Sequence, residues 1–253
     1  MCIVAFALHA HPDWPLVVIA NRDEYHSRAS APLAQWPKVN GAGSGIVAGR
    51  DLVGGGTWLG ISESGRLVLV TNFRVPGFPQ PARPSRGGLV TALLEGADPL
   101  GIDLAPYNPF SLLVADADGQ ALLLGNYPEP FNQPLPAGVH GLSNGPFTPA
   151  WPKTQRLCGA LQDWLNGGGD ETEPLFTALR DESPAESAEH GPEPRLSSVF
   201  ILDAVYGTRC STVVAVDRAG QGKVIERRFD DEGLAVGEVS VQFGQARTKP
   251  TAT

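Results

Sequence analysis

Glycine and proline constrain this chain more than any other feature of its sequence. The chain has 30 glycines and 23 prolines among 253 residues, about a fifth of its length. Both residues interrupt helices and mark turns, so long helices are excluded over most of the chain. Between the turns lie short apolar segments rich in β-branched residues, such as RLVLVT at residues 66–71. The sequence therefore predicts a sheet-rich architecture with few helices.

The positions of the apolar segments predict the order of the elements. Strands are expected at residues 2–8, 16–20, 45–48, 56–61, 66–71, 110–115, 121–125, 198–202, 212–217, 223–229 and 238–243. Helices are expected at residues 87–95, 153–165 and 174–180. Residues 21–44 are expected to form a polar cluster and a loop, and residues 181–194 a surface loop. Strands at both ends with helices between them predict one α+β domain over residues 1–243 and a disordered tail at 244–253.

Charge and composition argue against several classes of partner. Lys and Arg total 19 against 27 Asp and Glu, and the net charge of −8 argues against nucleic acid or an anionic membrane. No stretch approaches the roughly 18 apolar residues that span a bilayer, and the first residues lack the basic segment of a signal peptide. The cysteines Cys2, Cys158 and Cys210 are too scattered for a disulfide framework, and the histidines show no metal-ligand spacing. We therefore expect a cytoplasmic protein without a bound metal.

Cys2 is the sharpest candidate for chemistry. Once Met1 is removed, Cys2 carries a thiol and a free α-amine on one residue. An α-amine titrates at about 7.7–8.0, so it can take the thiol proton near neutral pH. This is the N-terminal-nucleophile arrangement, in which one residue supplies the nucleophile and its base. The alternative is a small hydrophobic residue at the start of a buried strand.

The first hairpin brings a polar cluster next to Cys2. If residues 2–9 and 16–23 pair in antiparallel fashion, the numbers of paired residues sum to about 25. Cys2 then faces Asp23, within one residue, with Arg22 and Glu24 beside it. In that position the charges would hold the amine and lower the thiol pKa. The alternative is a charge cluster that only caps the end of a strand.

Two asparagines and an arginine follow or precede predicted strands. Asn72 follows residues 66–71, Asn144 lies in the segment HGLSNGP, and Arg209 precedes residues 212–217. An asparagine amide can donate to a developing oxyanion, and an arginine can supply charge at a pocket rim. The alternatives are turn residues for the two asparagines and a solvated side chain for Arg209.

Several short blocks stand out in order along the chain. They are MCI at residues 1–3, NRDE at 21–24, GGTWLG at 55–60, TNFR at 71–74, SRG at 85–87, GLSN at 141–144, LSSVFI at 196–201 and GTR at 207–209. Together they resemble the NRDE family, also called the Transport and Golgi organisation 2 family. The resemblance extends to about residue 217. It implies a four-layer αββα sandwich of two antiparallel sheets, similar to the N-terminal-nucleophile fold of choloylglycine hydrolases and penicillin V acylases.

The resemblance also implies roles for individual residues. Cys2 matches the nucleophile of those hydrolases, and Arg22 with Asp23 matches their Arg/Asp pair. Asn72 resembles an oxyanion-side asparagine and Asn144 an amine-side asparagine. Arg209 resembles a late arginine more loosely. Further residues of the same blocks are expected to contact the ligand, namely Asn21, Glu24, Trp58, Phe73 and Arg74.

Three functions are consistent with these residues. The first is a cysteine N-terminal-nucleophile hydrolase of a non-peptide amide or an acyl thioester. The second is a non-catalytic protein that binds and delivers haem, a lipid or an acyl-CoA, roles that the resemblance suggests. Trp36, Trp58, Phe73 and Phe78 would then line a flat apolar pocket. The third is a protein–protein interaction module. In the first two cases we expect a small-molecule or acyl ligand, and no cofactor apart from haem as a transported ligand.

Overall fold

The structure, a computed structural model, describes residues 2–37, 45–117, 119–169, 171–185 and 191–244. The tail predicted to be disordered at residues 244–253 lies, apart from Gly244, outside the described residues.

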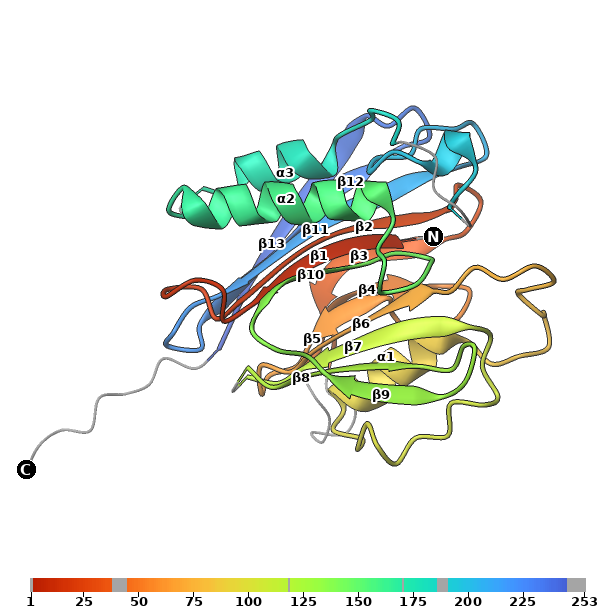
Figure 1. Cartoon of the computed structure of the whole chain (residues 1–253), viewed down its shortest axis with the longest axis horizontal. Coiled ribbons are helices and arrows are strands. Elements are labelled where there is room, and N and C mark those ends of the chain that lie inside the picture. The colour runs from red at the N-terminus through yellow and green to blue at the C-terminus, as the bar shows by residue number, and fades with distance from the viewer. Residues whose placement is uncertain (1, 38–44, 118, 170, 186–190, 245–253) are drawn as a thin grey trace, which may run out of the picture.

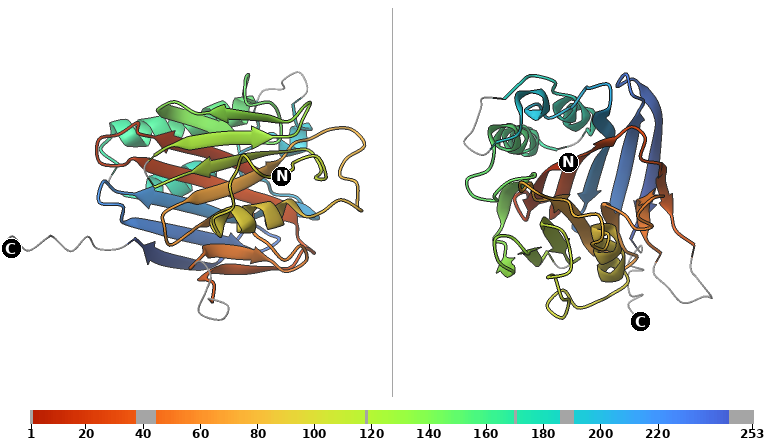
Figure 2. Two further views of the ribbon diagram at one scale, coloured as in Figure 1. Left: turned by 90° about the horizontal axis from the view of Figure 1, so that it is seen from below. Right: turned by 90° about the vertical axis from the view of Figure 1, so that its right-hand side faces the viewer.

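Two antiparallel sheets stack against each other at the centre of the molecule (Figure 1 and Figure 2). The first sheet has the order β10-β1-β2-β11-β12-β13 and the second the order β3-β4-β5-β6-β7-β8-β9. The strands of the first sheet are β1 (Cys2–Leu8), β2 (Leu16–Tyr25), β10 (Gly138–Leu142), β11 (Tyr206–Val216), β12 (Gly222–Phe229) and β13 (Ala235–Phe243). Those of the second are β3 (Ser30–Gln35), β4 (Val47–Asp51), β5 (Leu59–Ile61), β6 (Leu67–Asn72), β7 (Phe110–Ala115), β8 (Ala121–Gly125) and β9 (Phe131–Pro134).

Helices cover the outer face of each sheet and complete four layers. Helix α1 (Arg86–Leu94) packs on the second sheet, and α2 (Pro152–Asn166) and α3 (Glu173–Leu179) pack on the first (Figure 1). A 3-10 turn spans Pro194–Leu196. The predicted αββα class is confirmed, as are the three predicted helices, each with bounds shifted by one residue or so.

Strand β1 shows why the apolar segments of this chain are nearly continuous. Val4 and Phe6 join the core between the two sheets, whereas Ile3 and Ala5 join the core beneath α2 and α3. Successive side chains of a strand point to opposite faces, so a strand that is covered on both faces must be apolar at every position. The strands at the two ends of the chain meet in one sheet, as predicted, because β2 pairs with β11.

The first hairpin has nearly the predicted register. Cys2 lies opposite Arg22 and Leu8 opposite Leu16, so paired numbers sum to 24 and Cys2 faces Arg22 instead of Asp23. The expectation that the polar residues after position 20 leave the strand is wrong. Strand β2 continues to Tyr25 because β11 pairs with it as far as Tyr206.

The strand predicted at residues 198–202 is also wrong. This segment is irregular, because side chains take up its backbone groups. Asn21 donates to the carbonyl of Val199 at 3.0 Å, and the Thr208 hydroxyl accepts from the Ile201 N–H at 2.9 Å. Strands β3, β9 and β10 were absent from the prediction, and β3 replaces part of the loop expected before residue 44.

A close approach of two glycines anchors α1 against the second sheet. A Cβ atom added at Gly56 would lie 2.3 Å from the backbone carbon of Gly87, in the first turn of α1. The N–H of Thr57 donates to the Gly87 carbonyl at 3.4 Å, and the Ser85 hydroxyl caps the helix by accepting from Gly87 N–H. The blocks GGTWLG and SRG therefore meet in space.

We expect Gly56→Ala to lower the free energy of unfolding by about 2 kcal/mol or more, since backbone must shift to admit the methyl group. The matched control is Gly159→Ala. Gly159 lies in α2 and a Cβ atom there meets open space, so the change should stabilise the protein by about 0.5–1 kcal/mol. Urea unfolding of both variants measures the difference. Equal stabilities would show that the contact between Gly56 and Gly87 is not tight.

Candidate functional site

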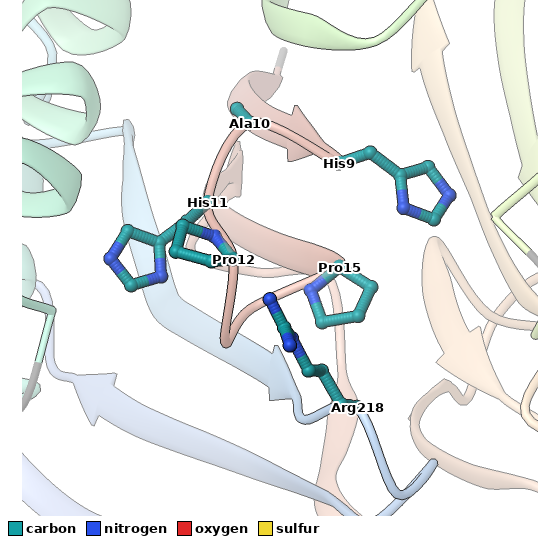
Figure 3. A pocket seen from close by; sticks show the side chains of 6 residues that line it. All are labelled: His9, Ala10, His11, Pro12, Pro15 and Arg218. Atoms are coloured by element: carbon teal, nitrogen blue, oxygen red, sulfur yellow. The ribbon is translucent and has the colours of Figure 1, made fainter.

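Two cavities lie at opposite ends of β1. An open depression of about 410 Å³ at the β1–β2 loop is lined by His9, Ala10, His11, Pro12, Pro15 and Arg218 (Figure 3). None of these lining residues is a nucleophile paired with a base. The second cavity lies beside Cys2, about 20 Å away along the strand. Its volume is about 10 Å³, room for about one water molecule.

The cavity beside Cys2 has a polar edge and apolar walls. Its lining contains Cys2, Asn21, Arg22, Trp58 and Thr212 together with apolar residues of both sheets. Burial raises the pKa of the Cys2 thiol, although the charge of Arg22 acts in the opposite direction. The backbone N–H of Asp23 donates to the sulfur. A thiol in this setting needs a base before it can act as a nucleophile.

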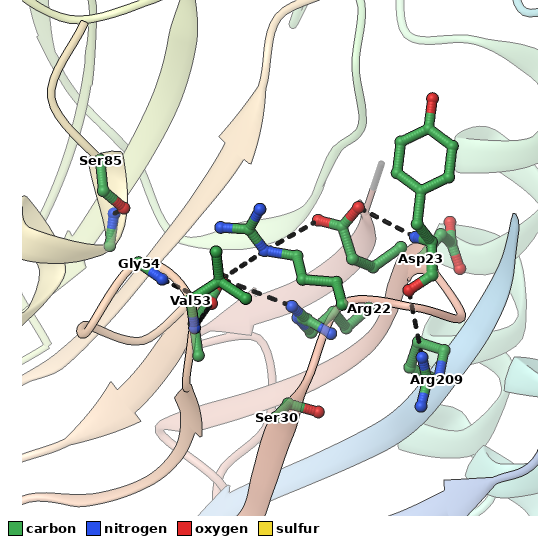
Figure 4. Close-up of polar contacts among 12 residues, drawn as sticks. Arg22, Asp23, Ser30, Val53, Gly54, Ser85 and Arg209 are labelled. Atoms are coloured by element: carbon green, nitrogen blue, oxygen red, sulfur yellow. Dashed lines mark hydrogen bonds and ion pairs between the residues drawn. The ribbon is translucent and has the colours of Figure 1, made fainter. Parts of the chain in front are cut away.

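Arg22 is the charged residue closest to Cys2 in the pairing register. The side chain is 4% exposed, and its guanidinium lies 4.3 Å from the ring centroid of Trp58. Nη2 lies 3.6 Å from Oδ2 of Asp51. A dashed line at the labelled Arg22 marks this ion pair in Figure 4. Nη1 is buried and has no hydrogen-bond partner within the described residues. Arg22 therefore has a donor that a ligand in the cavity can use.

Asp51 binds the Arg22 side chain in place, and the sequence analysis did not predict Asp51 as a site residue. Its carboxylate accepts from Arg28 Nε at 2.8 Å and from the N–H groups of Val53 and Gly54 at 2.9 Å each (Figure 4). Burial alone would raise the pKa of Asp51, but these hydrogen bonds bring it below its ordinary value. The only local signal is an aspartate before a glycine-rich turn, which is typical of any tight turn.

Cys210 lies on the other side of Arg22. Cys2 and Cys210 both pair with Arg22, one from β1 and one from β11. The Cys210 thiol is hydrogen-bonded to the buried Glu226, whose carboxylate also accepts from the Leu33 N–H at 2.8 Å. Burial raises the pKa of Glu226. Glu226 thus links the first sheet to β3 of the second.

The two candidate asparagines lie side by side. Asn144 Nδ2 donates to the backbone carbonyl of Asn72 at 2.7 Å. Strand β10 pairs Leu142 with Val4 of β1 and ends there, so Asn144 lies two residues beyond the last paired residue. Oδ1 of Asn144 is buried without a hydrogen-bond partner among the described residues. Arg22 therefore lies beside Cys2 on β2, whereas Asn144 follows the end of β10, the strand on the other side of β1.

Asn21 borders the cavity, but its side chain and that of Asp23 form their hydrogen bonds on the face of β2 that carries the helices. Asn21 Nδ2 donates to the carbonyls of Leu179 and Val199 at 2.8 and 3.0 Å, and its Oδ1 accepts from the Ser211 hydroxyl at 2.6 Å. All of its hydrogen-bonding atoms thus have partners within the protein. Asp23 is 1% exposed and its Oδ1 accepts from the Thr208 hydroxyl at 2.7 Å. Burial raises the pKa of Asp23.

The other charged candidates make contacts with the protein itself. The Glu24 carboxylate lies 3.7 Å from Arg28 Nε and accepts from the Tyr25 N–H. Arg209, at a bulge in β11, donates to the carbonyls of Tyr25 and His26 at 3.1 and 2.7 Å. Neither residue lines the cavity beside Cys2. Arg74 forms an ion pair with Glu193, and its N–H donates to the Asn144 carbonyl at 2.8 Å.

The expectation of one flat pocket lined by four aromatic residues is wrong. Trp58 packs in the core between the sheets, whereas Trp36 packs beside α1 on the outer face of the second sheet. Phe73 contacts the Tyr127 ring at a centroid distance of 5.0 Å, and Phe78 lies beneath Arg83. Strand geometry separates them, because these residues lie on different faces and loops.

Two features are absent from the part of the chain that the structure describes. No helix there is long and apolar enough to cross a membrane. No group of three or more His, Cys, Asp or Glu side chains within the described ranges is arranged to hold a metal ion.

Comparison with known proteins identifies relatives over nearly the whole chain. The family model described as Transport and Golgi organisation 2 matches residues 1–231. The Transport and Golgi organization protein 2 homolog of Homo sapiens is 32% identical over 272 residues, covering 93% of this chain and 95% of its own. The Mus musculus homolog is 31% identical, covering 92% and 94%. The Drosophila melanogaster protein is 24% identical, covering 89% and 91%.

Solved structures with low sequence identity share the fold. A variant of conjugated bile acid hydrolase from Clostridium perfringens matches with a TM-score of 0.55 at 9% identity, covering 95% of this chain and 92% of that one. A Caenorhabditis elegans ortholog of N-acylethanolamine-hydrolyzing acid amidase matches with a TM-score of 0.50 at 10% identity, covering 84% and 92%. These likenesses establish the N-terminal-nucleophile hydrolase fold.

The contacts of Asn21 assign it to the framework instead of the ligand. Asn21→Ala removes the partners of two carbonyls and one buried hydroxyl, so we expect a loss of about 3 kcal/mol in the free energy of unfolding. Asn132→Ala, at an exposed position of β9, is the control and should change it by less than about 0.5 kcal/mol. Urea titrations followed by tryptophan fluorescence measure both. Wild-type stability of Asn21→Ala would contradict the structural role.

Proposed function

The chain belongs to the Transport and Golgi organisation 2 family, and on that premise we propose that it is a hydrolase in which Cys2 cleaves a non-peptide amide or an acyl thioester. One observation carries the proposal. The Cys2 thiol lies opposite the buried Arg22 on the wall of one cavity, and Arg22 Nη1 has no hydrogen-bond partner among the described residues. Acyl transfer needs a nucleophile with donors close by, and the fold is one in which neighbouring proteins hydrolyse amides.

The chemistry starts from the chain after removal of Met1. The α-amine of Cys2 takes the thiol proton, and the thiolate attacks the carbonyl carbon of the substrate. As the tetrahedral intermediate collapses, the C–N or C–S bond breaks, and the leaving amine or thiol receives the proton from the Cys2 ammonium. Water, deprotonated by the same amine, then hydrolyses the acyl–sulfur bond and releases the acid.

The residues around Cys2 divide the remaining tasks. Arg22 Nη1 and the Asn72 amide supply donors for the oxyanion, with Asn144 holding the leaving amine and fixing the backbone of Asn72. Asp23 orients the Cys2 amine. Trp58 forms the wall of a cavity with room for about one water molecule, so substrate entry requires this side chain to move.

A second candidate function is binding and delivery without turnover. The closed cavity and the family description, which refers to transport, favour it. The ligand would be haem, a lipid or an acyl-CoA. Haem binding gives a Soret band on titration, and hydrolysis gives an acyl adduct on Cys2.

The deciding experiment is intact-mass analysis of the chain with a free Cys2, generated by a site-specific protease. Exposed to a panel of acyl amides and acyl thioesters, it should gain one acyl group on Cys2 and release product. Cys2→Ala should give neither adduct nor product, and Cys2→Ser should retain weak activity because a hydroxyl is harder to deprotonate.

The chain that keeps an N-terminal tag is the matched control. Its Cys2 amine is blocked, so its adduct should form at least about tenfold more slowly. Turnover that survives Cys2→Ala would refute Cys2 as the nucleophile. A Soret band in the wild type, changed in Cys2→Ala and without any acyl adduct, would favour the delivery function.

The two asparagines should differ in their effects. Asn72→Ala is expected to lower turnover of the acyl donor by about 10²–10³ with little change in stability, since it removes only an oxyanion donor. Asn144→Ala should lower turnover and also cost about 1–3 kcal/mol of stability, because it deletes a buried hydrogen bond. Steady-state kinetics and urea unfolding of each variant separate the two effects. A stability loss in Asn72→Ala with unchanged turnover would identify it as a turn residue only.

A further inference from the structure

Lys153 is a buried lysine that the proposed chemistry does not use. It lies in the first turn of α2 and is 1% exposed. Its Nζ donates to the carbonyls of Leu196 and Ser198 at 2.9 and 3.4 Å. Both acceptors are neutral, and a buried ammonium is costly without a negative charge nearby. The buried Lys153 ammonium therefore needs a negatively charged group nearby.

Asp23 supplies that charge from the neighbouring layer. It lies on the face of β2 that carries α2 and α3, and it is as deeply buried as Lys153. Apart from burial, Lys153 is the strongest influence on the pKa of Asp23, which it lowers. Asp23 is likewise the strongest on the pKa of Lys153, which it raises. Hydrogen bonds tie both groups to one segment, residues 196–201, and there their opposite charges favour each other's ionised forms across the interface between sheet and helix.

One irregular segment, residues 196–201, holds both groups in place. Its carbonyls at Leu196 and Ser198 accept from Lys153. Its Ile201 N–H donates to the Thr208 hydroxyl, which in turn donates to the Asp23 carboxylate. Because this segment serves side chains on α2 and β11, it cannot pair as a strand.

We propose that Lys153 is a positioning residue whose buried charge keeps the Asp23 carboxylate ionised next to Cys2. The backbone N–H of Asp23 contacts the Cys2 sulfur, so the position of Asp23 fixes the surroundings of the thiol. The inference rests on the proposed function of Cys2 and assigns to that site a residue on a different layer.

Other charged groups also face the pair. Arg22 of β2 and the positive amino terminus of the chain favour the Asp23 carboxylate. Arg74, in the loop after β6, disfavours the Lys153 ammonium, whereas Cys2 of β1, as a thiolate, favours it. The variants below keep all of these groups, so any change that they cause comes from the loss of Lys153 or Asp23.

The pH dependence of stability tests the charge pair without any substrate. In Lys153→Gln the donor remains but the charge is lost, so the Asp23 pKa rises further above its unfolded value. Stability then falls as pH increases through that window. In Asp23→Asn the Lys153 pKa falls further below its unfolded value, so stability falls as pH decreases. The double variant lacks both effects.

We expect the melting temperature of Lys153→Gln, relative to wild type, to drop by about 5 °C more at pH 9 than at pH 5, and that of Asp23→Asn to show the opposite trend. The double variant should lose less stability than the sum of the two losses and show neither trend with pH. Lys153→Arg, which keeps the charge, should also follow the wild type. Lys223→Gln is the control, because Lys223 is exposed on β12.

Activity gives the readout for positioning. With an acyl donor that labels Cys2, the acidic limb of kcat/KM should move to higher pH by about one unit in Lys153→Gln but not in Lys153→Arg. The charge pair would be overturned if the pH–stability curves of the two single variants ran parallel to the wild-type curve and their stability losses added up in the double variant. A charge pair without any shift of the acidic limb would overturn the positioning role. Absence of any Cys2 adduct would refute the proposed function and leave the stability result standing.

Discussion

Three consecutive polar side chains, Asn21, Arg22 and Asp23, are buried in the middle of the first sheet, and the rest of the structure depends on satisfying them. Strand alternation sends Arg22 toward the second sheet and the other two toward the helices. A buried polar group left without a partner costs about 1–3 kcal/mol, and a charged one more. Asp51 and Trp58 meet Arg22 from the second sheet. On the other face, hydroxyl groups of β11 and the irregular segment before it form hydrogen bonds with Asn21 and Asp23. One short motif therefore fixes how the sheets and the helical layer sit against one another.

What could be read from the sequence was local. The hairpin of β1 and β2 has a short loop and two apolar strands, so its register was predicted within one residue. Residues 198–202 were assigned to a strand from their composition, but side chains far away in sequence occupy backbone groups of this segment. The burial of Lys153 could have been predicted from its spacing in the sequence. It stands four residues before Leu157, on the same stripe as Leu161, which is the buried face of α2. The partner of each missed residue lies in another layer, and no local pattern announces it.

The geometry of the candidate site is set by the pairing of strands and not by a loop. Cys2 begins the strand β1, and its register with β2 places Arg22 opposite it at fixed spacing. Sites built on strands are held more rigidly than sites built on loops. Burial keeps the pKa of the Cys2 thiol high. The proposed nucleophile therefore needs a base, and its own α-amine is the proposed one. The residues that were matched to the family motif but lie outside the cavity, such as Arg209 and Glu24, instead fasten the end of β2.

The pairing of β1 with β10 and of β2 with β11 has a consequence for biogenesis. Val4 pairs with Leu142, and Leu16 pairs with Val216, so these contacts join the beginning of the chain to its second half. Long-range pairings of this kind form late. During synthesis the first hairpin leaves the ribosome long before its neighbours exist, and its amino terminus stays accessible to processing enzymes throughout that interval. The thiol becomes enclosed only when β11 has been translated. The topology of the sheet therefore sets the interval during which the amino terminus stays accessible.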